Sequence, residues 1–319
     1  MYEKMLSNSR LLQQLLPSIC RRFSTGSRAI IAQKSGSAEK KNVVMVPIQT
    51  PFMPDRAGRL PLNMVPQLNE IASFHLRANK VGRLFADLEK NGLISVAKVQ
   101  EIKVFPEFYQ HWKTNDNLQI QCTLHDVGTK SFNLQFDIYD NTSTIVLCRN
   151  MRSIVVCDVK MKPCVIPKEP LDFLNSVAFH KERYFIPKAF STIPVETYEW
   201  NTIIRPSDLD GYYHVNQANY LEIMLDAAVS GARNGIYKSL RQDIAFASVD
   251  QIILDYAREL CLDEQVWVKT WEDNEHPMKL CFEMTTGSKM AFQGSILLKE
   301  PLLKLSDENK QNFPRAEEF

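Results

Sequence analysis

The sequence has no long run of apolar residues. Its most apolar stretches are interrupted by Lys, Asp or Asn every few positions, so none approaches the roughly 18 residues that a membrane-spanning helix requires. It also has no Lys/Arg-rich tract, and its 38 basic residues nearly balance its 37 acidic residues. Because a polyphosphate partner requires a basic surface, we expect no nucleic-acid partner, and we expect no membrane span.

The sequence also has no closely spaced pair of cysteines. The seven cysteines form an odd set without a Cys-x-x-Cys motif, and the closest group, Cys148, Cys157 and Cys164, lacks the short spacing that zinc ligands prefer. We therefore expect no metal centre at these residues. We interpret the cysteines as reduced and mostly buried.

What the chain does contain is enough apolar material for one large or two medium domains: 319 residues, 45% hydrophobic and 24% charged. From residue 43, one order of elements occurs twice. Strand and helix periodicities place the first set at 42–52 (strand), 62–90 (helix, broken near 80–82) and in four strands from Gly92, Leu118, Ser131 and Ser143. The second set comprises a strand at 198–206, a helix at 214–237 and four strands between 248 and 300. This order predicts an α+β fold with two antiparallel sheets, each wrapped around a long helix.

The pattern also predicts the domain boundaries. We expect a first domain at 43–162 and a second at 195–300. Residues 163–194 hold five prolines and no clean periodicity, which indicates a linker. Residues 301–319 form a polar tail, and residues 1–40 a flexible arm.

The first 31 residues are basic, nearly free of acids and amphipathic. Leucines at 11, 12, 15 and 16 follow a helical spacing, and Glu3 is accompanied by five basic residues, Lys4, Arg10, Arg21, Arg22 and Arg28. This pattern is typical of a mitochondrial transit peptide, and "RRFSTG" suggests cleavage near Phe23 or Ser24. The alternative is a disordered basic tail without a targeting role. We expect a location in the mitochondrial matrix.

A polar cluster precedes the second predicted helix, in "SDLDGYYHVNQANYLE" (207–222). Ser207 or Asp208 could simply cap the helix. That interpretation leaves Asp210, His214 and Asn216 unexplained, at a point where helix amides could also stabilise an oxyanion. A carboxylate and an imidazole so placed could act as a general base or nucleophile. On spacing alone, a cap and a reaction site remain equal alternatives.

This cluster resembles the D-x-D-x-x-x-H-V-N-x-x-x-Y signature of hot-dog-fold thioesterases. The two-half layout is similar to that of the double hot-dog acyl-acyl-carrier-protein thioesterases, in the 4-hydroxybenzoyl-CoA thioesterase-like superfamily. Two further stretches agree, "VGRLFADLEKNGLISVAKVQEIKVFPEF" (81–108) and "LDYARELCLDEQVWV" (254–268), and the likeness spans nearly all of 43–300. It implies two tandem hot-dog domains, with the acyl pocket shaped by the first and catalysis carried by the second.

The resemblance also implies the site residues. The family hydrolyses fatty acyl thioesters with an Asp, an Asn, a His and a Glu; its aspartate falls on Asp210, its histidine on His214 and its glutamate on Glu259. The asparagine's place holds Tyr212, so the Tyr212 hydroxyl or Asn216 would have to position the substrate. No metal or cofactor is implied. Asp210, aided by His214 and Glu259, would activate water or attack the thioester, while amides at the helix start stabilise the oxyanion.

In such enzymes a cysteine directly follows the glutamate, but in this sequence it does not. Leu260 stands in its place, and the thiol is at Cys261. Because side chains alternate along a strand, Glu259 and Cys261 should share a face and Leu260 should point away. We therefore interpret Cys261 as a packing residue and not as a nucleophile.

Several alternatives stay open. A catalytically weak acyl-binding protein would have the same fold, with Tyr212 marking lost chemistry; a hot-dog dehydratase ranks below it, because its motif is absent from the sequence. The carrier (acyl carrier protein or coenzyme A), the chain length and the choice between monomer and homodimer are undetermined. The first half has no second signature, so we expect one site per chain and ordinary roles for His75 and His125.

The targeting prediction is tested by placing a fluorescent protein after residue 40. Because an amphipathic basic segment is expected to direct import, the fusion should accumulate in mitochondria, as seen by microscopy with a matrix marker. Diffuse cytosolic fluorescence would contradict the prediction.

Overall fold

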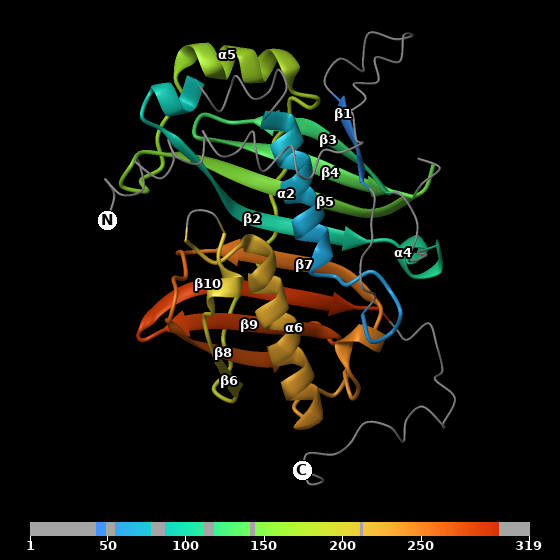
Figure 1. The fold of residues 1–319 in the computed structure, drawn as a ribbon. Helices are drawn as coiled ribbons and strands as arrows, with labels where there is room; N and C mark the ends of the chain where they lie inside the picture. The colour runs from blue at the N-terminus through green and yellow to red at the C-terminus, as the bar shows by residue number, and fades with distance from the viewer. Residues whose placement is uncertain are drawn as a thin grey trace.

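The computed structural model describes residues 43–48, 55–77, 87–111, 118–140, 144–210 and 213–299. Its strands form one continuous sheet (Figure 1). They are β1 (Val43–Ile48), β2 (Ile94–Val104), β3 (Leu118–Val127), β4 (Ser131–Tyr139), β5 (Val146–Cys157), β6 (Tyr198–Ile203), β7 (Val249–Tyr256), β8 (Gln265–Glu272), β9 (Lys279–Thr286) and β10 (Lys289–Leu298). The helices are α2 (Met64–Arg77), α4 (Pro106–His111), α5 (Lys168–Val177) and α6 (Gln217–Arg233), with 3-10 turns η1 (Pro206–Asp208) and η2 (Ile244–Phe246).

The strand order shows that the two halves repeat one topology. The sheet runs β1-β3-β4-β5-β2-β7-β10-β9-β8-β6. Counted outward from the centre, the first half runs β2-β5-β4-β3-β1 and the second runs β7-β10-β9-β8-β6, which is the same order of equivalent strands. The halves meet where β2 pairs antiparallel with β7, from Val99↔Asp255 to Lys103↔Gln251. The sequence pattern predicted two sheets, and the structure joins them into one. Pairing explains the difference, because separate sheets would leave β2 and β7 as edges with unpaired backbone groups.

The two long helices, α2 and α6, lie on one face of this sheet, α2 over the first half and α6 over the second (Figure 1). Alternate residues of the central strands, such as Ile252 and Leu254 on β7, point to this face and are fully buried in the main core. The predicted helix at 214–237 is α6, which begins at Gln217. In the first half α2 ends at Arg77, and the predicted break near 80–82 lies outside the described residues. None of the described helices is long and apolar enough to cross a membrane.

The part of the inter-half segment that follows α5 lies against the opposite face of the sheet. The sequence indicated no regular structure in this segment, but it contains α5, which is followed by residues 178–197 without a helix or strand. Ala189 and Phe190 form a second buried cluster with Ile253 of β7 and Trp271 of β8. Ile253 lies between Ile252 and Leu254, so this cluster is on the side away from the helices. The segment therefore stabilises the joint between the halves and does not merely link them.

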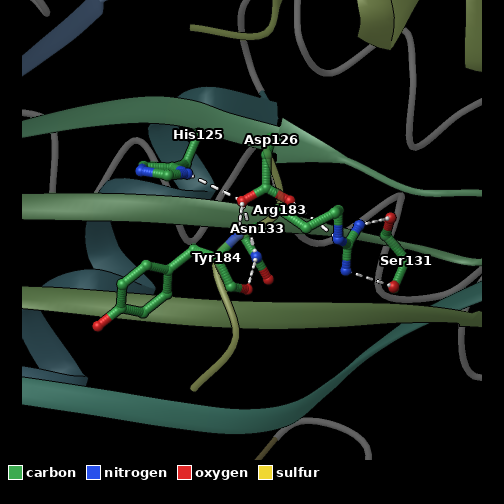
Figure 2. Close-up of polar contacts among 6 residues, drawn as sticks. All are labelled: His125, Asp126, Ser131, Asn133, Arg183 and Tyr184. Atoms are coloured by element: carbon green, nitrogen blue, oxygen red, sulfur yellow. Dashed lines mark hydrogen bonds and ion pairs between the residues drawn. The ribbon is translucent and has the colours of Figure 1, made fainter. Parts of the chain in front are cut away.

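A buried carboxylate attaches this segment to the first half (Figure 2). The Asp126 carboxylate is fully buried; it accepts hydrogen bonds from Asn133 Nδ2 (2.8 Å) and the backbone N–H of Tyr184 (3.1 Å), and lies 3.2 Å from Arg183 Nε. Its Oδ2 is also 2.9 Å from Nδ1 of His125. This arrangement gives His125 a structural role, in agreement with the sequence interpretation.

Helix α6 lies close to the Tyr237 side chain at Gly231, and this contact generates a stability prediction. A Cβ there would lie 2.7–2.8 Å from the Tyr237 ring and hydroxyl, and Tyr237 is buried and hydrogen-bonded to Thr270 (2.6 Å). Gly231→Ala should gain about 1 kcal/mol of helix propensity but lose about 2–3 kcal/mol to overpacking. We expect a net loss of about 1–2 kcal/mol in urea unfolding.

A double variant provides the control. In a Tyr237→Ala background the obstructing ring is gone, so the same Gly231→Ala exchange should raise stability. The packing account would be wrong if Gly231→Ala had the same effect in both backgrounds.

Candidate active site

The site begins with a loop between η1 and α6, and Asp208 holds this loop in shape. Asp208 Oδ2 accepts from the Arg205 backbone N–H (2.7 Å), and Oδ1 lies 3.1 Å from Nη2 of Arg205. Its backbone oxygen accepts from the Asn216 N–H (2.9 Å) and from Asn219 Nδ2 (2.8 Å). Asp208 therefore has a structural role, but its carboxylate belongs to the capping box of η1 and does not cap the long helix, as the sequence suggested it could.

Asp210 and His214 close a tight turn. The Asp210 N–H donates to the His214 oxygen (2.8 Å), and the His214 N–H lies 3.4 Å from Asp210 Oδ1. Within the turn, Tyr213 has a positive φ of 65° and its side chain is exposed. A bulky residue in this region of backbone space is strained, and such strain is frequent at functional sites. Tyr213 could not be identified from the sequence, because a positive φ at a tyrosine leaves no sequence signature.

His214 and Glu259 meet although 45 positions separate them. His214 Nε2 lies 3.2 Å from Glu259 Oε2, and the two side chains are 21% and 45% exposed, respectively. Both groups are therefore reachable from solvent while remaining paired. A proton on Nε2 would donate to the carboxylate and fix the orientation of the imidazole.

Residues 258–261 are attached to the start of α6, and this attachment places Glu259. The Val215 N–H donates to the Leu260 oxygen (2.9 Å), and His214 forms an isolated β-bridge with Cys261. The Tyr220 hydroxyl accepts from the Leu260 N–H (3.0 Å) and donates to the Arg258 oxygen (3.3 Å). Burial raises the pKa of Tyr220, so its hydroxyl stays protonated. Tyr220 is the last residue of the signature, and sequence reasoning missed its role as a positioning residue.

Asn216 is the N-cap of α6. Its side-chain oxygen accepts from the Ala218 N–H (2.9 Å), which satisfies one of the first free amides of the helix. Substrate positioning by its amide nitrogen stays a prediction. The other predicted positioning residue, Tyr212, lies outside the described residues.

The segment around Glu259 differs from the predicted strand. β7 ends at Tyr256, and residues 257–260 follow it as irregular chain. Leu260 is nevertheless buried while Glu259 and Cys261 are exposed, so the expected alternation of faces is present. The interpretation of Cys261 as a packing residue is wrong, because its side chain is exposed. The other described cysteines are also free, and four of them are buried: Cys122, Cys148, Cys157 and Cys281.

The Cys261 thiol is poorly suited to nucleophilic chemistry. Partial desolvation of the sulfur by neighbouring atoms, together with the carboxylates of Glu264 and Glu259, raises the pKa of the Cys261 thiol, and Arg258 acts in the opposite direction. The thiolate is the reactive form, so a raised pKa reduces its population near neutral pH. Among the described residues, no group of three His, Cys, Asp or Glu side chains could hold a metal ion.

Comparison with known proteins identifies the fold. No family model and no curated protein matches the sequence. Among solved structures, an acyl-ACP thioesterase from Bacteroides thetaiotaomicron is similar, with 16% identity, a TM-score of 0.64, and coverage of 82% of this chain and 100% of that one. The 12:0-ACP thioesterase from Umbellularia californica is similar at 16% identity and a TM-score of 0.63, with coverage of 81% and 97%.

The chain has the double hot-dog fold. This confirms the predicted fold class, in which a long helix is wrapped by an antiparallel sheet in each half. Both solved structures match along almost their full lengths, so the match includes the two halves and their arrangement. The likeness defines the fold, and the chemistry rests on the residues of the site.

Cys261 allows a direct test of the electrostatics of the site. Because its thiol pKa is raised, its alkylation by iodoacetamide should be slow at neutral pH and keep increasing above about pH 8.5, where an ordinary thiol is half ionised. Peptide mass spectrometry measures the rate. Glu264→Gln removes a nearby negative charge and should shift the profile toward lower pH. An alkylation rate that reaches half its maximum at or below the pH expected for a free thiol would contradict this description.

Proposed function

We propose that the chain hydrolyses fatty acyl thioesters to a free fatty acid and a thiol. The observation that carries the proposal is the pairing of His214 with Glu259 beside Asp210, at the start of a long helix in a double hot-dog fold. The similarity to acyl-ACP thioesterase structures supports the same reaction class. The sequence character of residues 1–31 supports a location in the mitochondrial matrix, where the carrier would be coenzyme A or acyl carrier protein.

The proposed reaction begins with attack on the thioester carbonyl. Asp210 accepts the proton of a water molecule as its oxygen bonds to the carbonyl carbon, or the Asp210 carboxylate attacks directly and water then cleaves the resulting anhydride. Glu259 keeps the His214 imidazole oriented toward this centre. The sequence and geometry are compatible with both routes.

The oxyanion and the leaving group need little further help. An α-helix leaves its first N–H groups without intrahelical partners, so Gln217, the first residue of α6, presents such an amide near His214. This amide would stabilise the negative charge on the former carbonyl oxygen. When the tetrahedral intermediate collapses, the C–S bond breaks and the sulfur leaves as a thiolate. A thiol is acidic enough, with a pKa of about 8.5, to leave without a strong general acid.

Carboxylate variants test this proposal. Asp210→Asn and Glu259→Gln keep the size of each side chain but remove its charge, so each should lower kcat on long-chain acyl thioesters by about 10²–10⁴-fold. Thiol release, followed with a chromogenic disulfide, measures the rate. Cys261→Ser should retain the activity of the unmodified chain and serves as the matched control.

The outcomes distinguish the alternatives. Full turnover by both carboxylate variants would contradict the assignment of the site. Saturable binding of acyl thioesters without thiol release, by the unmodified chain, would instead identify the weakly active acyl-binding protein that Tyr212 suggests.

A further inference from the structure

A second group of polar side chains lies on the helix-facing side of the sheet, close to the joint between the halves. We call Asn69 of α2, Gln100 of β2, and Asn150 and Arg152 of β5 the inner polar cluster. All four are at most 3% exposed. Gln100 and Arg152 are directly opposite in the β2–β5 register, so they share a face. None of these residues belongs to the site described above.

The inner polar cluster is connected to the start of α6. Asn150 Nδ2 donates to Gln100 Oε1 (2.8 Å), and Gln100 Nε2 donates to Gln217 Oε1 (2.8 Å) and to the Tyr256 hydroxyl (3.0 Å). Gln217 is the first residue of α6 and follows His214 by three positions. The polar contacts therefore extend from the first half of the sheet to the edge of the candidate active site.

Several buried atoms of the cluster have no hydrogen-bond partner in the described part of the chain. They are Nε and Nη2 of Arg152, Oδ1 of Asn150, and both Nδ2 and Oδ1 of Asn69. Buried polar groups without partners are costly, and native proteins rarely retain them without a purpose. A guanidinium that is almost fully buried with two unused donors is unusual in a surrounding core of apolar residues. We therefore consider these atoms as contacts for a ligand.

The charge of Arg152 and the mixture of unpartnered donors and acceptors in the inner polar cluster indicate which ligand group would fit. Arg152 Nη1 bonds to Glu70 Oε1 at 2.7 Å, so the positive charge is already compensated, which disfavours an anionic group. The unpartnered atoms include donors, on Arg152 and Asn69, and acceptors, on Asn69 and Asn150. A hydroxyl group both donates and accepts, whereas a carbonyl only accepts and a methyl does neither.

We propose that the inner polar cluster binds a hydroxyl group on the acyl chain, so that the substrates are hydroxyacyl thioesters. This inference rests on the proposed function, because it assumes that the acyl chain enters the first half from the start of α6. The hydroxyl accepts from Arg152 or Asn69 Nδ2 and donates to an amide oxygen of Asn150 or Asn69. A plain alkyl chain leaves these atoms unpaired and is disfavoured.

The test compares acyl-CoA thioesters of equal chain length. One has a plain alkyl chain, one has a terminal carboxylate, and a set of positional isomers each carries a single hydroxyl at a different carbon. A site that hydrogen-bonds a hydroxyl strongly rejects the analogue without it, so for at least one position kcat/KM should exceed that of the plain chain by at least about tenfold. A plain chain that equals or exceeds every hydroxylated isomer would overturn the inference, and so would a preference for the carboxylate.

Asn69→Leu is the informative variant, because it removes two unpartnered atoms without breaking a described side-chain hydrogen bond. It should raise the melting temperature and lower the hydroxyl-to-plain ratio of kcat/KM by about tenfold. Asn175→Leu, the same exchange on the exposed surface of α5, should leave the ratio unchanged. A higher melting temperature with an unchanged ratio would show that Asn69 is merely an unpaired core residue, and would overturn its assigned role.

Binding measurements separate this inference from the proposed hydrolysis. If no thioester is cleaved, the proposed function fails, but calorimetry with free hydroxylated and plain fatty acids still tests the cluster. Tighter binding of a hydroxylated acid, reduced by Asn69→Leu, would support the inference. Equal binding of both acids would overturn it.

Discussion

The antiparallel pairing of β2 with β7 is the constraint on which the rest of the structure depends. It converts two half-sheets into one sheet and brings α2 and α6, one over each half, into contact on a single face. It also allows Gln100 of the first half to contact Gln217 at the start of α6. The opposite face is covered by the segment that follows α5, which is attached through Asp126 and through the apolar contacts of Phe190. The β2–β7 pairing thus connects the candidate reaction site to the first half.

The candidate site itself depends on backbone contacts more than on the ion pair. An interaction between partly exposed groups such as His214 and Glu259 contributes at most about 1 kcal/mol to stability. The position of Glu259 is instead determined by the bonds of Leu260 to Val215 and Tyr220. Because the fold does not depend on the small stabilisation that this pair contributes, Glu259 can act mainly to orient the His214 imidazole. Strain at Tyr213 in the adjacent turn agrees with a local shape selected for function.

The elements with clear periodicity could be predicted from the sequence. Strands β2 to β5 and β6 to β10 and helix α6 occur where the alternation and helical spacing indicated, with ends that differ by a few residues. The ends are harder to predict because they depend on tertiary contacts: Asn216, and not Asp208, caps α6, and β7 stops at Tyr256 although the apolar pattern continues. The local sequence pattern gives no signal for the joint between β2 and β7, since the pairing of two buried strands depends on which strands meet in the fold.

The site was predictable only in part. The resemblance named Asp210, His214 and Glu259, and the structure brings all three to the start of α6. It could not show that Asp208 is structural or that Tyr220 positions the glutamate, because both roles arise from hydrogen bonds between segments distant in sequence. Arg152 has no motif at all. Only its burial and its unused donors identify it.

A crystal structure of the Asp210→Asn variant with a long-chain acyl thioester bound would test the proposed site without ambiguity about where the substrate lies. We expect the thioester carbonyl oxygen to accept a hydrogen bond from the Gln217 N–H at the first turn of α6, with the carbonyl carbon beside the His214 and Glu259 pair and the acyl chain extending toward β2 and β5. A thioester bound elsewhere on the chain, or a carbonyl remote from His214, would contradict this expectation.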